Sequence, residues 1–339
     1  MKKELSKYYP LTFSHVYKSA LWGGNKISSF REDLDGDKEL LIGESWELVD
    51  REDGQSCVQN GPLEGVSLRN LIENDPEGIV GKGHKPDQSF PLLCKIIDAR
   101  KDLSLQVHPN EKCCTYLKDA EPKTEMWYVL DHDENAEIMN GIKKNVSNKE
   151  FWEMLDSPKI KDLMTVFKTR RGDSYLIQAT KMHSIGGGNL IYEIQQNSNT
   201  TYRVSDWGRK GLDGKARELH LFEAKTCLEH GSRTSKKSKL PFRGVSHYYN
   251  NSKYKLSHKN LSVCPYFIVD ELSLEGKISF FNSQKCFQTI YAIDNDLEIK
   301  SDYYSLSLPK GQTCLLPAGL EKFEVKSNGN SSFLRAQSA

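Results

Sequence analysis

Short runs in which apolar and polar residues alternate recur along the whole chain, and glycine, asparagine, aspartate and proline separate them. This two-residue period is typical of strands that bury one face, because successive side chains of a strand point to opposite sides. The pattern therefore predicts a mostly β chain. The clearest predicted strands are residues 44–49, 92–97, 103–107, 126–130, 175–178, 190–194 and 287–293.

Helical patterns are fewer and shorter. Ser147 and Glu150 have the spacing of a capping box, and four large apolar or aromatic residues follow within 151–155. They predict a small helical insertion near 145–165. Further helices are predicted at 67–73 and at 218–228, the second with Leu219, Phe222 and Leu228 at helical spacing. Strands with a few helices indicate β-sandwiches or barrels that carry helical insertions.

A basic, serine-rich stretch divides the chain at residues 231–244, where the sequence Ser-Arg-Thr-Ser-Lys-Lys-Ser-Lys occurs. That composition is typical of a solvated linker. We therefore predict one domain at 1–231 and a smaller domain at 245–339.

A weak internal repeat suggests that the two domains are related. The segment Arg171–His183 can be laid on Lys310–Lys322: a basic residue and a glycine begin both, and an alanine follows seven residues after the glycine. His183 of the first copy corresponds to Lys322 of the second. The pattern fits two jelly rolls of which only the first keeps a metal ligand, so the second is predicted to be metal-free.

Charge and composition narrow the functional classes. The 339 residues include 47 basic and 46 acidic side chains, a balance that argues against non-specific binding of nucleic acid or of an anionic membrane. No apolar run approaches the roughly 20 residues of a membrane span, and the polar N-terminal segment lacks the apolar stretch of a signal peptide. The eight cysteines form no CxxC pair. We expect a cytoplasmic protein with reduced thiols.

A candidate polar cavity follows from the segment 103–109. If this segment is a strand, its alternation separates two faces. Leu103, Leu105 and Val107 would form the apolar face, whereas Ser104, Gln106 and His108 would share the other.

Two further residues complete a metal-ligand set with His108. Glu125 lies in another strand-like run, where a buried carboxylate is costly unless it is paired or bound to a metal. His183 begins a glycine-rich turn. Two histidines and one carboxylate suit zinc and also suit non-haem iron, and Gln106 is available as a neutral oxygen ligand.

Longer motifs give these residues a family context. Gln106-Val-His-Pro109 followed by Lys123-Thr-Glu-Met-Trp127 is the most specific pair. With it the chain resembles the mannose-6-phosphate isomerases (phosphomannose isomerases), in their shorter bacterial, zinc-dependent cupin form, over residues 9–230. The supporting segments are Tyr9–Phe13, Leu21–Gly24, Ile42–Glu47, Phe90–Lys95, Glu193–Gln196, Thr201–Arg203, Asp206-Trp207 and Arg217–His220.

The resemblance implies two cupin-type jelly-roll units and an isomerase of carbohydrate metabolism that interconverts mannose-6-phosphate and fructose-6-phosphate. It implies one zinc ion, Zn²⁺, per chain, held by Gln106, His108, Glu125 and His183. By position it also implies a phosphate contact at Ser104, a further basic contact at Arg209, and functional roles for Lys123, Glu193 and Arg203. One departure from the family pattern is Gln178-Ala-Thr180 where Pro-Ala-Gly is usual.

The chemistry of the reaction suggests a role for each of these residues. Aldose–ketose isomerisation moves a proton between neighbouring carbons through an enediol-like intermediate, and Arg203 is suited to stabilising the developing oxyanion. Glu193, Lys123 and a metal-bound hydroxide each remain possible bases. Lys95 is a third residue of a type suited to binding phosphate, beside Ser104 and Arg209.

Two other functions fit part of the pattern. A non-haem iron oxygenase would use the same two histidines and carboxylate, although a fourth ligand at Gln106 argues against the open positions that O₂ chemistry needs. A catalytically silent sugar-phosphate-binding cupin would keep the metal and lose turnover. The expected partner is a small-molecule sugar phosphate, and the oligomeric state is open.

Overall fold

The computed structural model describes residues 8–31, 34, 41–155, 157–211, 214–231, 246–282 and 286–339. Their contacts form two compact units. We call residues 17–46 and 94–242 the helix-flanked unit, and residues 1–16, 47–93 and 243–339 the large-sheet unit. Apart from Gly231, the predicted linker lies outside the described residues. The division into domains at 1–231 and 245–339 stays a prediction. The contact units are described separately, and neither is continuous in sequence.

Two sheets form the helix-flanked unit. The six-stranded sheet has the order β11-β8-β13-β6-β2-β3, and the five-stranded sheet has the order β10-β9-β12-β7-β14. The strands of the first are β2 (Val16–Gly24), β3 (Ile42–Leu48), β6 (Leu92–Ala99), β8 (Glu125–His132), β11 (Ser174–Ile177) and β13 (Asn189–Gln196). Those of the second are β7 (Leu105–Val107), β9 (Glu137–Ile142), β10 (Met164–Lys168), β12 (His183–Ile185) and β14 (Tyr202–Ser205).

One hydrophobic core of this unit joins the two sheets. Trp22, Trp127 and Ile191 of the six-stranded sheet pack with Ile138 and Ile185 of the five-stranded sheet. Removing such side chains from water is the main favourable contribution to folding. The metal-ligand candidates therefore lie on strands that are held in place by a continuous core, or directly after one of them.

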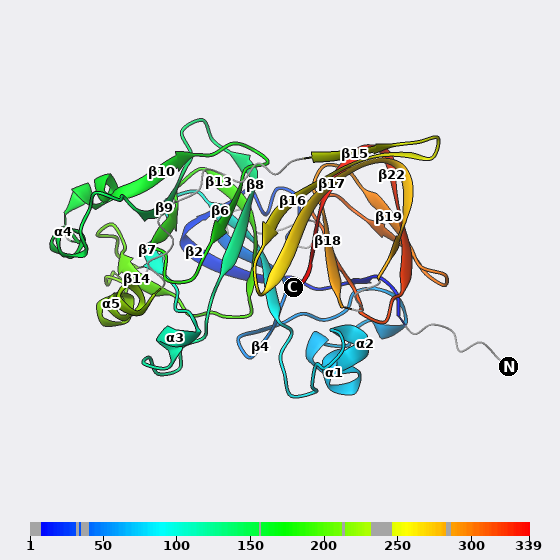
Figure 1. Ribbon diagram of the computed structural model, residues 1–339, viewed down its shortest axis with the longest axis horizontal. Helices are drawn as coiled ribbons and strands as arrows, with labels where there is room; N and C mark the ends of the chain where they lie inside the picture. The colour runs from blue at the N-terminus through cyan, green and yellow to red at the C-terminus, as the bar shows by residue number, and fades with distance from the viewer. Residues whose placement is uncertain are drawn as a thin grey trace. The chain divides into compact units, whose positions relative to one another are not determined.

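Helices cover the other face of the five-stranded sheet (Figure 1). Leu105 and Val107 of β7 pack in one cluster with side chains from the helices α3 (Glu111–Cys114), α4 (Asn148–Glu153), η3 (Pro158–Leu163) and α5 (Leu221–His230). The predicted alternation therefore holds within β7, where Gln106 points away from these helices. It is wrong for Leu103, which packs in the inter-sheet core, because the strand begins only at Leu105.

The predicted helical insertion near 145–165 is confirmed by α4 and η3. Ser147 caps α4 by accepting a hydrogen bond from the amide of Glu150 (3.1 Å). For α5 the predicted apolar face is wrong: Leu219 precedes the helix, and Phe222 is 72% exposed. The small residues Ala224 and Cys227 are buried instead, since they allow the helix to approach the sheet closely.

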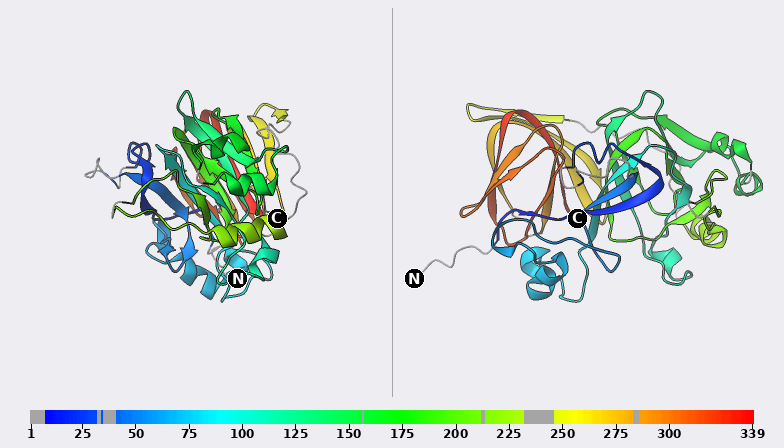
Figure 2. Two further views of the ribbon diagram at one scale, coloured as in Figure 1. Left: turned by 90° about the vertical axis from the view of Figure 1, so that its left-hand side faces the viewer. Right: turned by 180° about the vertical axis from the view of Figure 1, so that it is seen from behind.

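The large-sheet unit has one nine-stranded sheet with the order β1-β21-β18-β22-β17-β16-β15, and β19 and β20 extend it from β22. Figure 2 shows its yellow-to-red strands curving around one interior. The first half of β22 pairs with β19 and its second half with β18, so the sheet folds over a single core. Its strands are β1 (Leu11–Thr12), β15 (Ser246–Asn250), β16 (Tyr254–Val263), β17 (Phe267–Phe281), β18 (Gln288–Ala292), β19 (Leu297–Lys300), β20 (Ser305–Leu308), β21 (Thr313–Leu316) and β22 (Lys322–Ser338).

Smaller elements complete this unit. They are β4 (Asp50–Arg51), β5 (Gly54–Gln55), η2 (Gly61–Leu63), α1 (Leu68–Asn74) and α2 (Pro76–Ile79). The helix predicted at 67–73 is present as α1, and Ser67 caps it by accepting a hydrogen bond from the amide of Asn70 (3.1 Å). Every strand predicted from the alternation is present within a few residues of its expected limits.

The internal repeat has a structural counterpart. Strands β11 and β21 begin at equivalent positions of the two aligned segments, and β12 and β22 begin at the equivalent residues His183 and Lys322. Gly172 and Gly311, which precede β11 and β21, have φ angles of 83° and 80°. This left-handed conformation favours glycine, so the two turns require the same residue for the same reason. The two segments thus have matching local structure, although only one carries a histidine.

No helix within the described ranges has both the length and the apolar composition needed to cross a membrane.

Candidate active site

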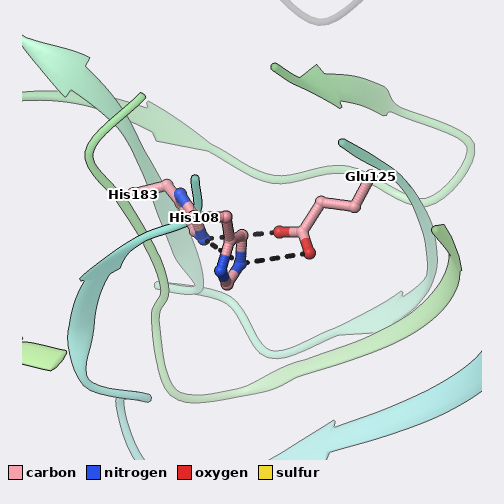
Figure 3. A group of neighbouring side chains, drawn as sticks. All are labelled: His108, Glu125 and His183. Atoms are coloured by element: carbon pink, nitrogen blue, oxygen red, sulfur yellow. Dashed lines mark hydrogen bonds and ion pairs between the residues drawn. The ribbon is translucent and has the colours of Figure 1, made fainter. Parts of the chain in front are cut away.

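Three strands bring the predicted metal ligands together. Gln106 of β7 lies directly opposite His183 of β12 in the five-stranded sheet. His108 follows β7, and Glu125 begins β8 in the six-stranded sheet. Figure 3 shows both imidazole rings directed at the carboxylate of Glu125. The site therefore lies between the two sheets, where both contribute ligands.

The donor atoms converge on one small region. The Nε2 atoms of His108 and His183 are 3.1 Å apart, and each lies 3.3 Å from an oxygen of Glu125. The amide nitrogen of Gln106 is 3.3 Å from Nε2 of His183. Each of the three charged or titratable side chains is about 1% exposed, so bulk water does not solvate them.

Backbone carbonyls orient both imidazoles. Nδ1 of His108 donates to the carbonyl oxygen of Thr200 (2.9 Å), and Nδ1 of His183 donates to that of Lys181 (2.7 Å). A proton on Nδ1 leaves the Nε2 lone pair of a neutral ring free for a metal. The backbone therefore presets both histidines in the tautomer that a metal ligand needs.

The electrostatics of the site favour the same charge states. Burial, reinforced by the neighbouring Lys123, lowers the pKa of His108 to about 3. Burial also lowers the pKa of His183. Burial alone would raise the pKa of Glu125, but Lys123 and the two histidines outweigh it and hold that pKa well below its ordinary value. Neutral histidines and an ionised carboxylate are the forms that bind metals.

The carboxylate of Glu125 is incompletely satisfied by protein groups. Neither of its oxygens accepts a hydrogen bond from the part of the chain that the structure describes, although Nζ of Lys123 lies 3.2 Å from Oε2. A buried charged oxygen without hydrogen bonds is costly. A metal cation between Glu125, His108 and His183 would satisfy these oxygens and both Nε2 lone pairs, so the donor set fits a metal ion.

A cavity of about 330 Å³ opens next to these ligands and is lined mainly by polar and charged side chains. The predicted residues Lys95, Ser104, Gln106, Lys123, Glu193 and Arg203 all line it. So do Ala20, Trp22, Glu44, Ile97, Leu103, Ile185, Asn199, Thr201 and Arg217. Its volume is in the range of small-molecule sites.

Glu193 and Lys95 face this cavity from neighbouring strands of the six-stranded sheet. Nε1 of Trp127 donates to Oε2 of Glu193 (2.8 Å), and Nζ of Lys95 lies 3.6 Å from Oε1. Burial, reinforced by the charge of Glu125, raises the pKa of Glu193 to about 7. A carboxyl group with such a pKa can exchange a proton near neutral pH.

The two arginines predicted as site residues, Arg203 and Arg209, differ in whether they line the cavity. Arg203 of β14 lies opposite Gln106 in the sheet, and its Nη1 donates to the carbonyl of Glu218 (2.8 Å). Arg209 is not among the lining residues: its guanidinium donates to the carbonyl of Asp102 (2.5 Å) and to the backbone carbonyl and carboxylate of Asp206 (3.1 and 2.5 Å). Arg217, which does line the cavity, also binds the Asp206 carboxylate (2.8 Å from Nε).

Comparisons with known proteins identify the family. The family model for the catalytic domain of type I phosphomannose isomerase matches residues 11–144, and the model for the mannose-6-phosphate isomerase cupin domain matches residues 257–333. Mannose-6-phosphate isomerase ManA of Bacillus subtilis (strain 168) is 35% identical over 318 residues, which cover 94% of this chain and 96% of that protein. The chain belongs to the type I phosphomannose isomerase family.

Further similar proteins are also named as mannose-6-phosphate isomerases. Mannose-6-phosphate isomerase of Streptococcus mutans is 32% identical over 281 residues, 80% of this chain and 87% of that protein. The crystal structure of the mannose 6-phosphate isomerase from Bacillus subtilis matches with a TM-score of 0.82 and 27% identity, over 96% of this chain and 99% of that one. These matches confirm the resemblance seen in the sequence, the enzyme class and the mostly β cupin fold.

One departure from the family pattern has a structural consequence. Thr180 stands where the pattern has glycine, and its φ is 68°. A β-branched residue rarely adopts this left-handed conformation. Its amide donates to the carbonyl of His108 (2.7 Å), so the turn connects the segment before His183 to the other histidine of the cluster.

The sequence analysis did not assign Arg217, Asn199 or Thr201 to the site. Arg217 lies in the motif Arg217–His220, which supports the family resemblance and was the available signal. Asn199 and Thr201 follow β13 in a loop, and no alternation rule shows where loop side chains point. Glu44, on β3, is in the motif Ile42–Glu47 and lines the cavity beside Lys95.

Proposed function

We propose that this protein is a zinc-dependent aldose–ketose isomerase that interconverts mannose-6-phosphate and fructose-6-phosphate. The observation that carries the proposal is the convergence of His108, Glu125 and His183 beside a cavity lined by lysine and arginine. The relatives named mannose-6-phosphate isomerase support the substrate. A sugar phosphate is an anion with many hydroxyls, and a polar, cationic cavity of this size suits it.

Zinc is the metal we propose, one ion per chain. Zinc ligands at 2.0–2.1 Å in a tetrahedron lie about 3.3–3.4 Å from one another. The two Nε2 atoms are 3.1 Å apart, and each lies 3.3 Å from a different oxygen of Glu125, distances close to that value. Gln106 would be the fourth ligand once its amide turns to present Oε1, and its nitrogen would then donate to Ser104, whose hydroxyl now contacts Oε1 (3.2 Å).

Within this proposal Glu193 is the base. Its Oε1 removes the proton from C2 of the open-chain aldose, the C–H electron pair forms the C1–C2 double bond, and the electron pair of the C1=O π bond moves to O1, which takes up a proton to give the enediol. O2 then loses its proton and forms the C2=O bond, while the electron pair of the C1–C2 double bond takes the proton back from the same carboxyl group onto C1. No proton is gained or lost over the cycle. When bound, zinc supplies Lewis acidity and orients the sugar hydroxyls.

Two cations stabilise the negative charge that develops on the sugar oxygens. Arg203 lines the cavity from β14, and Lys123 lines it beside Glu125. Fixed positive charges directed at a developing oxyanion are a large contribution to catalysis in a site shielded from water. The phosphate requires donors outside the metal shell, and Ser104 and the arginines that bind Asp206 would supply them.

Lys95 and Arg209 were predicted as phosphate contacts and stay predictions. The ammonium of Lys95 lies between two carboxylates, and the guanidinium of Arg209 is already bound to Asp206 and to a backbone carbonyl. We expect Arg217 to be the stronger phosphate contact, because it reaches both Asp206 and the cavity.

We also propose a cytoplasmic location. All eight cysteines are free thiols, including the neighbours Cys113 and Cys114. Unpaired cysteines are typical of proteins kept in a reducing compartment.

The test is a coupled assay of mannose-6-phosphate conversion on protein stripped with a chelator and then restored with Zn²⁺ or Fe²⁺. Activity that disappears on stripping and returns with zinc supports the proposal. Consumption of O₂ by the iron-loaded protein, without isomerisation with either metal, would support the oxygenase instead. Protein that binds zinc and sugar phosphate without turnover would support the silent binding protein.

A stability measurement accompanies the assay. A ligand that binds only the folded state at 100 times its Kd stabilises by about 2.7 kcal/mol. Zinc should therefore raise the unfolding temperature of the stripped protein, whereas Mg²⁺, which prefers oxygen ligands, should not.

A further inference from the structure

Two carboxylates share one lysine on the cavity side of the six-stranded sheet. Strand β6, which carries Lys95, pairs with both β13 and β3, which carry Glu193 and Glu44. Nζ of Lys95 lies 3.1 Å from Oε2 of Glu44 but 3.6 Å from Oε1 of Glu193. Only the first distance is within normal hydrogen-bond range. The lysine is thus held by Glu44.

Each carboxylate also receives an indole hydrogen bond. Nε1 of Trp46 donates to Oε2 of Glu44 (2.7 Å), and Nε1 of Trp127 donates to Oε2 of Glu193 (2.8 Å). These bonds fix both groups on the cavity wall. They leave Oε1 of Glu193 buried and without a hydrogen bond from the described part of the chain.

We propose that Glu44 is a positioning residue for the isomerisation: its carboxylate holds the Lys95 ammonium, and this leaves Oε1 of Glu193 free to take the proton from the substrate. The inference rests on the proposed function, in which Glu193 is the base. The ammonium of Lys95 then neutralises the carboxylate of Glu44 and does not form a hydrogen bond with Glu193. Without Glu44, the ammonium would close on Glu193 and weaken it as a base.

The charges around Glu193 give the direction of this effect. Burial and the carboxylates of Glu125 and Glu44 raise the pKa of Glu193, whereas Lys123 and Lys95 lower it, with a result of about 7. Loss of Glu44 removes one group that raises the pKa and lets Lys95 come closer. Both changes lower the pKa of Glu193.

The experiment compares zinc-loaded wild type with Glu44→Gln, Lys95→Met and the double variant. The first substitution removes a charge and keeps the shape, and the double variant keeps the net charge of the cavity. Glu137→Gln, at an exposed residue of β9, is the matched control. Two quantities are measured from pH 5 to 9: kcat and KM, and the titration of carbon-13-labelled glutamate carboxyls, with Glu193→Gln assigning its signal.

In Glu44→Gln, we expect the midpoint of the Glu193 carboxyl titration to move at least about one pH unit lower. The pH at which kcat rises from its low acidic value should fall by the same amount. The plateau kcat should fall about fivefold, because a base with a lower pKa abstracts protons more slowly. KM and bound zinc should not change. Lys95→Met should move both midpoints higher, and the double variant should return them toward wild type.

Either of two results would overturn the inference: an unmoved Glu193 midpoint in Glu44→Gln, or a midpoint unchanged by Lys95→Met. The Lys95→Met measurement remains decisive even if Glu44→Gln does not fold. The carboxyl titration needs no turnover, so a wild type without isomerase activity would disprove the proposed function while the link between Glu44, Lys95 and Glu193 was still measured.

Discussion

Nε2 of His108 lies 3.1 Å from Nε2 of His183, and both rings donate through Nδ1 to backbone carbonyls. Two neutral imidazoles so arranged point lone pairs at one another, which is unfavourable in a buried space. A cation between them turns the repulsion into two bonds. The arrangement is therefore compatible with a metal site that is preformed in the folded chain.

The substitution His108→Ala tests this site directly. We expect it to reduce zinc affinity by at least about 100-fold, since losing even an outer-shell partner of a metal ligand costs 10- to 100-fold. Isomerase activity should be lost together with bound zinc, measured by elemental analysis. His132→Ala, which changes a histidine outside the cluster, should keep both. Full zinc content in His108→Ala would contradict the assigned ligand set.

Arg203→Ala separates metal binding from turnover. Arg203 lines the cavity without being a ligand, so zinc content should stay at one ion per chain. The loss of a donor at the oxyanion should lower kcat about 10²- to 10³-fold. Arg203→Lys keeps the charge and should recover part of this loss. Turnover near the wild-type value in Arg203→Ala would mean that the oxyanion is stabilised elsewhere.

Arg217 and Arg209 make opposite predictions for phosphate binding. Arg217→Ala should raise KM about thirtyfold, the equivalent of about 2 kcal/mol for a charge-assisted hydrogen bond. Arg209→Ala should raise KM far less and instead lower the unfolding temperature, since Arg209 holds Asp206 and the carbonyl of Asp102. A larger KM effect for Arg209→Ala would support the contact expected from the sequence alone.

Gln106 and the two arginines show which side-chain positions can be predicted from the sequence and which cannot. Gln106 was placed correctly because strand alternation fixes the face of a side chain. Arg209 and Arg217 lie after β14, outside any strand or helix, where the direction of a side chain depends on which carboxylate it meets. Asp206 binds both arginines, and only the folded chain shows which one faces the cavity.

The contact units and the ion pair between Glu44 and Lys95 could not be predicted from the sequence, because both depend on contacts between distant segments. Residues 47–93 join the large-sheet unit although they precede most of the helix-flanked unit in sequence. Glu44 meets Lys95 because β3 pairs with β6. Pairing between distant segments depends on tertiary packing, which local patterns do not encode.

The pH dependence of kcat tests Glu193 as the base. Only the ionised carboxylate can take a proton, and the pKa of Glu193 is raised to about 7, so kcat should rise with pH through this value. Glu193→Gln should lower kcat about 10²- to 10⁴-fold and abolish this limb. An acid limb that persists in Glu193→Gln would assign the base to another group, such as Lys123.

Asp270 offers a stability prediction in the large-sheet unit, far from the chemistry in sequence. Its carboxylate binds Arg335 (2.8 Å), Asn260 (3.0 Å) and His258 (2.9 Å). Burial alone would raise the pKa of Asp270, but Arg335, His258 and Asn260 hold it below the ordinary value of 3.8. Asp270→Asn should lower the free energy of unfolding by about 2 kcal/mol at pH 7.

The sign of the pH effect follows from the lowered pKa. The contribution of Asp270 is fully present above the pKa of the unfolded chain and is lost as the pH falls through the lower folded-state pKa. In urea unfolding followed by circular dichroism, the difference between wild type and Asp270→Asn should therefore stay constant from pH 8 to about 5 and shrink below 3.8. Asp302→Asn, at an exposed residue, should show no difference. A difference for Asp270→Asn that persists undiminished at pH 3 would mean that the carboxylate charge is not what stabilises this cluster.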